Sequence, residues 1–210
     1  MTSPPALQIE AVVHPVERPA LAAAARQLAD ALSTAGGSPH PTTLRFSDSL
    51  ASISRSAGRA VVVASLLPEI ASPDESLVQT EARWRDQLLS LEKLDIASAF
   101  VCTIFRHVGS REAPALIERI RRLNLLAVQL SHDTRVGVID IDRIFAYFGA
   151  RQLRTDYRLG GKLGVGLAGH TIVAGILATG LDDVIPPDVQ EHAQKVQAGM
   201  LNRLSGEVTW

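Results

Sequence analysis

The 210-residue sequence lacks several features that would assign it to a functional class. It has one cysteine, Cys102, so an intrachain disulfide and a cysteine-based metal site are excluded. The net charge is −1 and the basic residues are scattered, so there is no basic surface for nucleic acid. No stretch contains the roughly 20 apolar residues needed to span a bilayer. We therefore expect neither a nucleic-acid partner nor a membrane span.

The N-terminus also lacks the pattern of an export signal. In "MTSPPALQIEAVVHPVERP" no charged segment precedes a long apolar run. Cys102 lies in the apolar stretch "ASAFVCTIF", which is typical of a buried and inert thiol. These observations predict a cytoplasmic protein.

What the sequence does contain is an alternation of strand-like and helix-like segments, separated by turns rich in proline, glycine and serine. Apolar, β-branched runs predict strands at 7–13, 42–46, 59–66, 97–105 and 136–142. Helical periodicity predicts helices at 19–32, 72–91, 116–130, 168–181 and 187–204. This order predicts a mostly parallel five-stranded sheet with helices on both faces, a three-layer α/β/α fold.

The predicted helices divide the chain into two parts. We expect residues 1–182 to form the α/β domain, with a long loop from 149 to 166, and residues 183–210 to form a C-terminal amphipathic helix. This helix is expected to pack on the domain, or to meet a protein partner or a second copy of the chain. Its apolar stripe consists of Val189, Ala193, Val196, Met200 and Leu204.

Candidate functional residues follow from the sheet, because ligands of parallel sheets bind outside the carboxyl ends of the strands. The catalytic candidates are Ser49, Ser65, His107 and Asp156. The ligand-binding candidates are His14, Arg18, Arg106, Asp142 and Arg158. The carboxylates follow no metal-ligand spacing, and the glycines at 160–166 do not form a dinucleotide loop. We therefore expect no metal and no cofactor, and a small polar ligand.

Two stretches in the second half of the chain resemble the SGNH/GDSL hydrolase superfamily. "RIRRLNLLAVQLSHDTRVGVIDIDRIFA" is similar to the family's penultimate helix and the strand that follows it. "TDYRLGGKLGVGLAGHTIVAGIL" is similar to its aspartate-bearing loop and last helix. The resemblance implies a three-layer α/β/α fold and hydrolysis or transfer of acyl groups by a Ser-His-Asp arrangement, without a metal.

The family's catalytic blocks are incomplete in this chain. The segment after the first strand, "VVHPVERP", has no serine, and "ASLLPEI" after the third strand has no Gly-x-Asn-Asp. The Asp-x-x-His block reads Asp156-Tyr157-Arg158-Leu159, and leucine cannot transfer a proton. The resemblance therefore predicts a divergent member without the standard triad, in which His170 is structural.

A different alignment uses "RFSDSL", residues 45–50, with Ser49 as the nucleophile. It puts Ser47 where the signature has the glycine of a tight turn, and it leaves residues 1–41 as an extension. The other interpretation of this segment is the end of the second strand followed by a short helix capped by Asp48 or Ser47.

Two functions remain open at this level. The first is a binding or accessory protein that does not use Ser-His-Asp chemistry. The second is an esterase, deacylase or acyltransferase acting on a small or carbohydrate ester, with Ser49 or Ser65 as nucleophile and His107 or His14 as base. A serine hydroxyl within about 3.5 Å of a histidine ring nitrogen at the carboxyl edge of the sheet would favour the second.

Overall fold

The computed structural model describes residues 6–53, 59–72, 75–109, 114–179, 181 and 184–207. Its centre is a five-stranded sheet in the order β2-β1-β3-β4-β5, with every neighbouring pair parallel. The strands are β1 (Leu7–Val12), β2 (Thr42–Phe46), β3 (Ala60–Ser65), β4 (Ile96–Cys102) and β5 (Gly137–Ile139). The predicted parallel sheet is confirmed.

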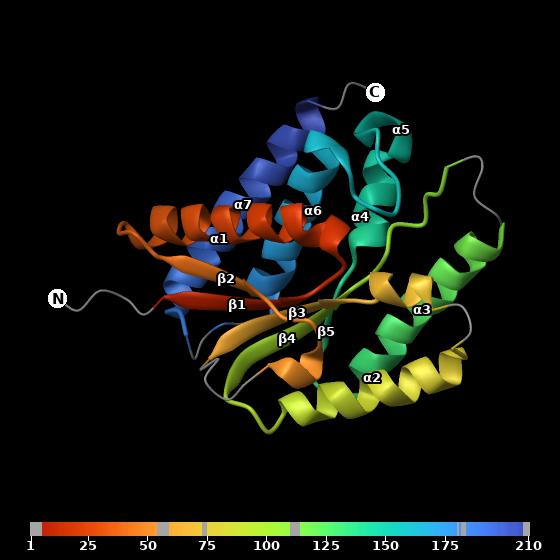
Figure 1. Cartoon of the computed structure of the whole chain (residues 1–210). Coiled ribbons are helices and arrows are strands. Elements are labelled where there is room, and N and C mark those ends of the chain that lie inside the picture. Colours follow the sequence, from red (N-terminus) through yellow and green to blue (C-terminus); the bar gives the residue numbers. More distant parts are fainter. Residues whose placement is uncertain are drawn as a thin grey trace.

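Helices cover both faces of the sheet, so the predicted three-layer fold is also confirmed. One face carries α1 (Arg18–Gly36), α6 (Gly161–Ala178) and α7 (Pro187–Glu207), and the other carries α2 (Leu77–Leu91) and α3 (Pro114–Asp133) (Figure 1). Two shorter helices, α4 (Ile141–Phe148) and α5 (Ala150–Leu153), follow β5. Short 3₁₀ turns η1 (Pro15–Glu17), η2 (Leu50–Ser52) and η4 (Leu67–Ala71) follow the first three strands.

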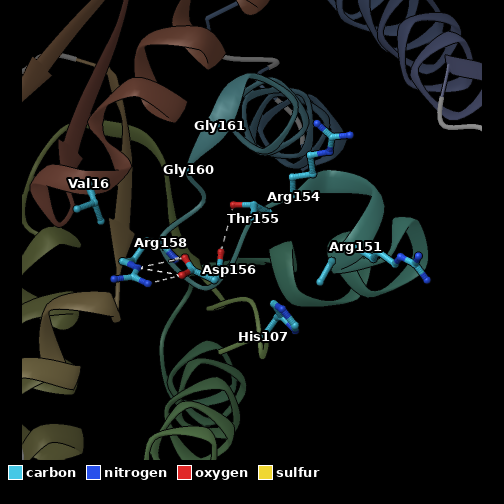
Figure 2. A pocket seen from close by; sticks show the side chains of 10 residues that line it. Val16, His107, Arg151, Arg154, Thr155, Asp156, Arg158, Gly160 and Gly161 are labelled. Carbon is cyan, nitrogen blue, oxygen red and sulfur yellow. Dashed lines mark hydrogen bonds and ion pairs between the residues drawn. The ribbon is translucent and has the colours of Figure 1, made fainter. Parts of the chain in front are cut away.

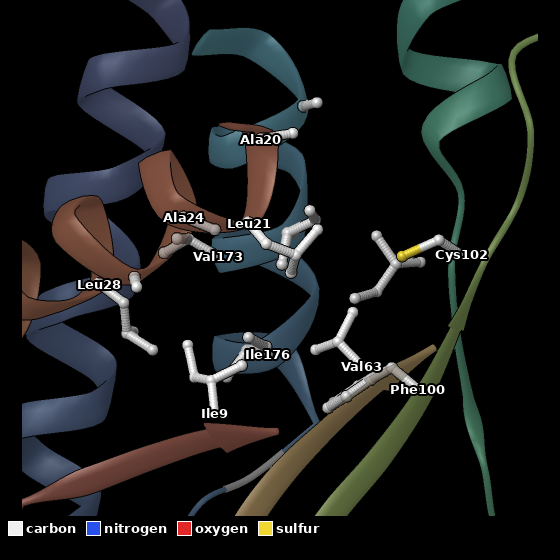
Figure 3. Close-up of a cluster of buried hydrophobic side chains, with 14 of the residues drawn as sticks. Ile9, Ala20, Leu21, Ala24, Leu28, Val63, Phe100, Cys102, Val173 and Ile176 are labelled. Carbon is white, nitrogen blue, oxygen red and sulfur yellow. The ribbon is translucent and has the colours of Figure 1, made fainter. Parts of the chain in front are cut away.

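The central strand β3 has the almost entirely apolar sequence "AVVVAS". All six residues are buried, because successive side chains point to opposite faces and both faces are covered. Val61 and Val63 join the core beneath α1 and α6, which Figure 3 shows together with Ile9, Phe100 and Cys102. The alternate residues of β3 join a second core beneath α2 and α3. This two-sided burial holds the strand ends in fixed positions.

The last core helix differs from the prediction. It begins at Gly161 rather than at residue 168, so the expected loop at 149–166 contains α5 and the first turns of α6. Of the glycines that suggested a loop, Gly164 lies inside α6 where a Cβ would come 3.0 Å from Oγ1 of Thr155. A Cβ on Gly169 would lie 3.0 Å from the Cβ of Ala23 and 3.1 Å from the backbone nitrogen of Ala24, both on α1. Contact with α1 therefore outweighs the poor helix propensity of glycine.

Two details at helix ends also differ from the prediction. The helix predicted from residue 72 begins at Leu77 as α2, and its N-cap is Ser76, whose hydroxyl accepts a hydrogen bond from the backbone N–H of Gln79. Residues 73 and 74 of the predicted helix lie outside the described residues. His170 lies within α6 rather than at its start, and its Nδ1 is 2.8 Å from Nε2 of Gln197 on α7.

The first part of the apolar stripe of α7 faces the rest of the chain, whereas the side chain of Leu204 lies outside the described ones. Ala193 is buried, and Val189 and Val196 pack against the core shared with α1 and α6. Gln190 fixes the start of the helix, since its side chain accepts from the Leu181 N–H and donates to the Leu177 carbonyl. The division at residue 182 and the expected partner stay predictions. One helix, α6, is long and apolar enough to cross a membrane, and its packing beside the sheet and α1 accounts for that composition.

Candidate functional site

The carboxyl ends of the strands meet at one edge of the sheet, and the candidate residues gather there in two separate groups. The first group lies where η1 meets the end of β3. The second group lies where the segment after β4 meets the loop at 154–160 that leads into α6. The two groups differ in burial and charge.

The first group is a buried junction between Glu17 and Ser65, which we call the Glu17–Ser65 junction. The Ser65 hydroxyl donates to Oε1 of Glu17 at 2.7 Å and accepts from the Leu67 N–H at 3.1 Å. The backbone N–H of His14 donates to Oε2 of Glu17 at 2.9 Å. Ser65 and Glu17 are only 1% and 5% exposed. Both side chains therefore tie the end of β3 to η1, out of contact with solvent.

Burial sets the protonation of this junction. It raises the pKa of Glu17 to about 7, against the smaller opposing effects of the hydrogen bonds from Ser65 and His14. Burial also raises the pKa of the Cys102 thiol, and the nearby Glu17 carboxylate adds to this effect. Cys102 is thus a buried thiol, as predicted, and its raised pKa makes it unreactive.

The second group lines an open cleft of about 750 Å³, which we call the cationic cleft. Its charged and ionisable lining side chains are His107, Arg151, Arg154, Asp156 and Arg158. Figure 2 shows Arg151 and Arg154 on the α5 side of Asp156, with Arg158 on the opposite side. Val16, Ala150, Thr155, Gly160 and Gly161 complete the lining. Among these described residues, three arginines therefore face one carboxylate.

The backbone joins the two walls of this cleft. The N–H of Tyr157 donates to the His107 carbonyl at 2.9 Å, and the His107 ring stacks on Phe105 with centroids 5.8 Å apart. The loop ends at Gly160, the N-cap of α6, which has no side chain to cap the helix. The first amides of α6 therefore face the cleft region without a capping side chain.

Asp156 is committed to its neighbour Arg158. Its Oδ1 accepts the Arg158 backbone N–H at 2.9 Å, and its carboxylate forms an ion pair with the Arg158 guanidinium. Partial burial opposes the charged form, but the hydrogen bonds from Arg158 and the charges of Arg158 and His107 together lower the pKa of Asp156. Asp156 thus stays ionised and already has a strong partner.

Leu159 takes the position where the resemblance requires a catalytic histidine. It is 4% exposed, belongs to the core beneath α1 and α6, and adopts a left-handed φ of 56°. The side chain points into the apolar interior instead of toward a serine. The Asp-x-x-His block is therefore replaced here by an apolar anchor.

Arg106 and Asp142 form a structural pair. Asp142 is 7% exposed, accepts the Arg106 backbone N–H at 2.8 Å and is 2.5 Å from the Arg106 Nε. Asp140 caps α4, since its side chain accepts a hydrogen bond from the Arg143 N–H. The Asn124 side chain clamps Ile104 by bonding both its N–H and its carbonyl. These contacts fix the end of β4.

The other candidates lie apart from the cationic cleft. Ser49 is the N-cap of η2, so the short helical turn after β2 is confirmed, but its cap is Ser49 and neither Asp48 nor Ser47. The guanidinium of Arg18 stacks over the ring of Phe46, 5.1 Å from its centroid. His14 caps η1, with its Nδ1 accepting the Val16 N–H at 3.3 Å.

No serine hydroxyl hydrogen-bonds a histidine ring in the part of the chain that the structure describes. Ser65 is bonded to Glu17, while His107 belongs to the cleft, which Ser65 does not line. Across the same residues, no three His, Cys, Asp or Glu side chains are grouped as metal ligands. The geometry that would favour the hydrolase is thus not formed by these residues.

Sequence reasoning missed Glu17, Arg151 and Arg154 as members of these groups. Glu17 comes three residues after His14, next to a proline-bounded turn, and only the packing of η1 on β3 buries it. Arg151 and Arg154 lie in a segment that was predicted to be a loop. The number of basic residues within 151–158 is the one signal that pointed to a cationic site.

Comparisons with known proteins support the fold. No family model and no curated protein matches this chain. An acetyl xylan esterase, AlAXEase, superposes with a TM-score of 0.59 at 12% identity, covering 79% of this chain and 98% of the esterase. A protein from Slackia heliotrinireducens assigned to the SGNH hydrolases gives a TM-score of 0.49 at 12% identity, covering 82% of this chain and 100% of that one.

A third solved structure is the C-terminal catalytic domain of peptidoglycan O-acetyltransferase A from Streptococcus pneumoniae. Its TM-score is 0.38 at 14% identity, covering 85% of this chain and 96% of that domain. The chain has a divergent SGNH-hydrolase-like fold, as the resemblance implied.

Proposed function

We propose that this protein is an SGNH-like binding protein that does not perform Ser-His-Asp ester chemistry and that holds a polar ligand in the cationic cleft. The observation that carries the proposal is the separation of the catalytic candidates. Ser65 is buried against Glu17, whereas His107 and Asp156 line an open cleft in which no serine is found among the described lining residues.

Ester hydrolysis by a serine needs a base that removes the hydroxyl proton and a carboxylate that orients the base. Leu159 stands at the position of the base, and the carboxylate of Asp156 is paired with Arg158. Because position 159 holds a leucine, no side chain at this position can act as the base. The cleft instead offers charged groups around an accessible volume, which suits binding.

An assay of the purified full chain tests the absence of hydrolysis. We expect release of nitrophenol from nitrophenyl acetate, and of acetate from acetylated xylooligosaccharides, at the rate of a serum-albumin control. We also expect no labelling by a fluorophosphonate probe. Turnover that disappears in Ser65→Ala or Ser49→Ala would contradict the proposal.

One observation favours an esterase or acyltransferase as the second candidate. Glu17 lies 2.7 Å from the Ser65 hydroxyl, and its pKa of about 7 suits a general base at neutral pH. Of the three solved structures described above, the one with a TM-score of 0.59 is an acetyl xylan esterase, which suggests an acetyl ester as substrate. In this alternative, Ser65 Oγ attacks the ester carbonyl and Glu17 accepts its proton. The tetrahedral intermediate then collapses to an acyl-enzyme as Glu17 returns the proton to the leaving alcohol, and the acyl group passes to water in an esterase or to a second alcohol in an acyltransferase.

Burial argues against this alternative, because an ester cannot reach a serine that is 1% exposed unless η1 or η4 moves. The pH dependence of any observed turnover separates the two candidates. A rate that rises through pH 7 in the wild type and is lost in Glu17→Gln would support the esterase. A slow rate that is equal in wild type and Glu17→Gln would be background hydrolysis.

A further inference from the structure

We propose that the ligand of the cationic cleft carries a phosphate monoester on a polar body. This inference rests on the proposed function, because it names the ligand of the same cleft. Three observations carry it: the excess of cationic side chains, the lack of an ion pair with any described carboxylate for two of them, and the size of the cleft.

The charge of the cleft is unbalanced. Asp156 is the only carboxylate among its described lining residues, and the Arg158 guanidinium pairs with it. Arg151 and Arg154 are exposed and form no ion pair with any carboxylate in the described part of the chain. Arg151, Arg154 and His107 thus line one volume in which the one described acid, Asp156, is already paired with Arg158.

The donor geometry favours phosphate over a carboxylate. A guanidinium presents a planar set of N–H donors that pairs bidentately with phosphate oxygens. A phosphate monoester has about two negative charges at neutral pH and three terminal oxygens, so it can receive donors from several sides. A carboxylate has one charge and two oxygens, and would leave one guanidinium uncompensated.

The size and lining of the cleft indicate the remainder of the ligand. A volume of about 750 Å³ is larger than a phosphate group needs. Thr155 and the glycines at 160 and 161 place a hydroxyl and backbone polar groups beside the charged side chains. A hydroxyl-rich body such as a sugar fits this environment better than an acyl chain.

Isothermal titration of the full chain at low ionic strength tests the proposal with four probes: glucose 6-phosphate, inorganic phosphate, glucuronate and glucose. We expect glucose 6-phosphate to bind more tightly than inorganic phosphate, and both to bind more tightly than glucuronate or glucose. Added salt should weaken binding of the phosphates, because screening acts on exposed charges.

A double variant and a matched control locate the site. Arg151→Gln with Arg154→Gln should weaken binding of glucose 6-phosphate at least about tenfold. Arg26→Gln with Arg121→Gln removes the same charge from exposed positions on α1 and α3, outside the cleft, and should leave the affinity within about twofold. Circular dichroism and thermal unfolding verify that both double variants are folded.

Several outcomes would overturn the inference. They are no heat with either phosphate, an equal loss of affinity in both double variants, or binding of glucuronate as tight as that of glucose 6-phosphate. Equal affinity for inorganic phosphate and glucose 6-phosphate would refute the polar body. The proposed function is judged separately on the same preparations, because ester turnover contradicts it whatever the titrations give. Absence of both turnover and phosphate binding contradicts this inference alone.

Discussion

Two regions of one sheet edge use their polar residues in opposite ways. At the Glu17–Ser65 junction, a serine and a carboxylate are buried, bonded to each other and to backbone amides, and removed from solvent. In the cationic cleft, a histidine, three arginines and an aspartate surround an open volume. The first region holds the groups that chemistry would use, and the second holds the accessible space.

This difference teaches that the fold alone does not decide where a buried serine and an open volume lie relative to each other. Ester chemistry requires nucleophile, base and substrate volume in one place. Here β3 carries Ser65 and the segment after β4 carries His107. The Ser65 hydroxyl, however, is hydrogen-bonded to Glu17 of η1. The predictions below test how separate the two regions are.

The largest effect is expected where the cleft loop is anchored in the core. Leu159→His places an imidazole among apolar side chains and removes buried apolar surface, so it should cost roughly 3–5 kcal/mol of unfolding free energy. Urea unfolding measures the loss. Leu159→Met is the matched control and should cost less than about 1.5 kcal/mol.

The same variant tests whether the missing histidine is the single obstacle to hydrolysis. We expect Leu159→His to show no esterase turnover, because Ser65 stays buried against Glu17. Turnover above the albumin control would show that the Glu17–Ser65 junction and the cationic cleft act as one site. That result would contradict the separation of the two regions.

The next effect is the pH dependence of stability caused by Glu17. Between its ordinary pKa of 4.5 and its folded-state pKa of about 7, the folded chain keeps a proton that the unfolded chain releases. Its contribution to stability is therefore complete below pH 4.5 and is lost as the pH rises through about 7. The loss should be on the order of 3 kcal/mol.

Urea unfolding at a series of pH values measures this slope, and Glu17→Gln isolates the group responsible. The glutamine amide can donate to Ser65 Oγ and accept from the His14 N–H, so the contacts remain while the titration disappears. An identical slope in the wild type and in Glu17→Gln would show that Glu17 does not titrate in this window.

A smaller effect is expected when the serine is removed. Ser65→Ala leaves Glu17 and the Leu67 N–H without one buried partner, which should cost roughly 1–3 kcal/mol. Ser49→Ala at the N-cap of η2 should change the unfolding free energy by less than about 0.5 kcal/mol. Chemical denaturation compares the two, and equal costs would argue against a special role of the junction.

The smallest effect belongs to the cleft arginines. Arg151→Gln and Arg154→Gln should each change the unfolding free energy by less than about 0.5 kcal/mol, because both side chains are exposed and carry no ion pair with a described carboxylate. Thermal unfolding without ligand measures this. A cost above about 1 kcal/mol would make these arginines structural and would weaken the contrast between the regions.

Much of the fold was predictable because strand and helix periodicities depend on local sequence. The run "RAVVVASL" predicted a strand buried on both faces, and β3 is such a strand. The start of α6 was not predictable, since glycine has a poor helix propensity and only the close approach of α1 explains Gly169. The role of Asp140 as a cap followed from its position after a strand, whereas the pairing of Asp142 with Arg106 depends on the neighbouring strand.

The sequence by itself determined the parallel sheet, the buried thiol of Cys102 and the absence of a histidine at position 159, because these follow from residue type and spacing. Only the tertiary structure decided what the polar residues do. Burial of η1 against β3 makes Glu17 a partner of Ser65, and the approach of the 154–160 loop to His107 forms an open, cationic cleft. Both outcomes depend on contacts between segments far apart in the chain, which a local pattern does not encode.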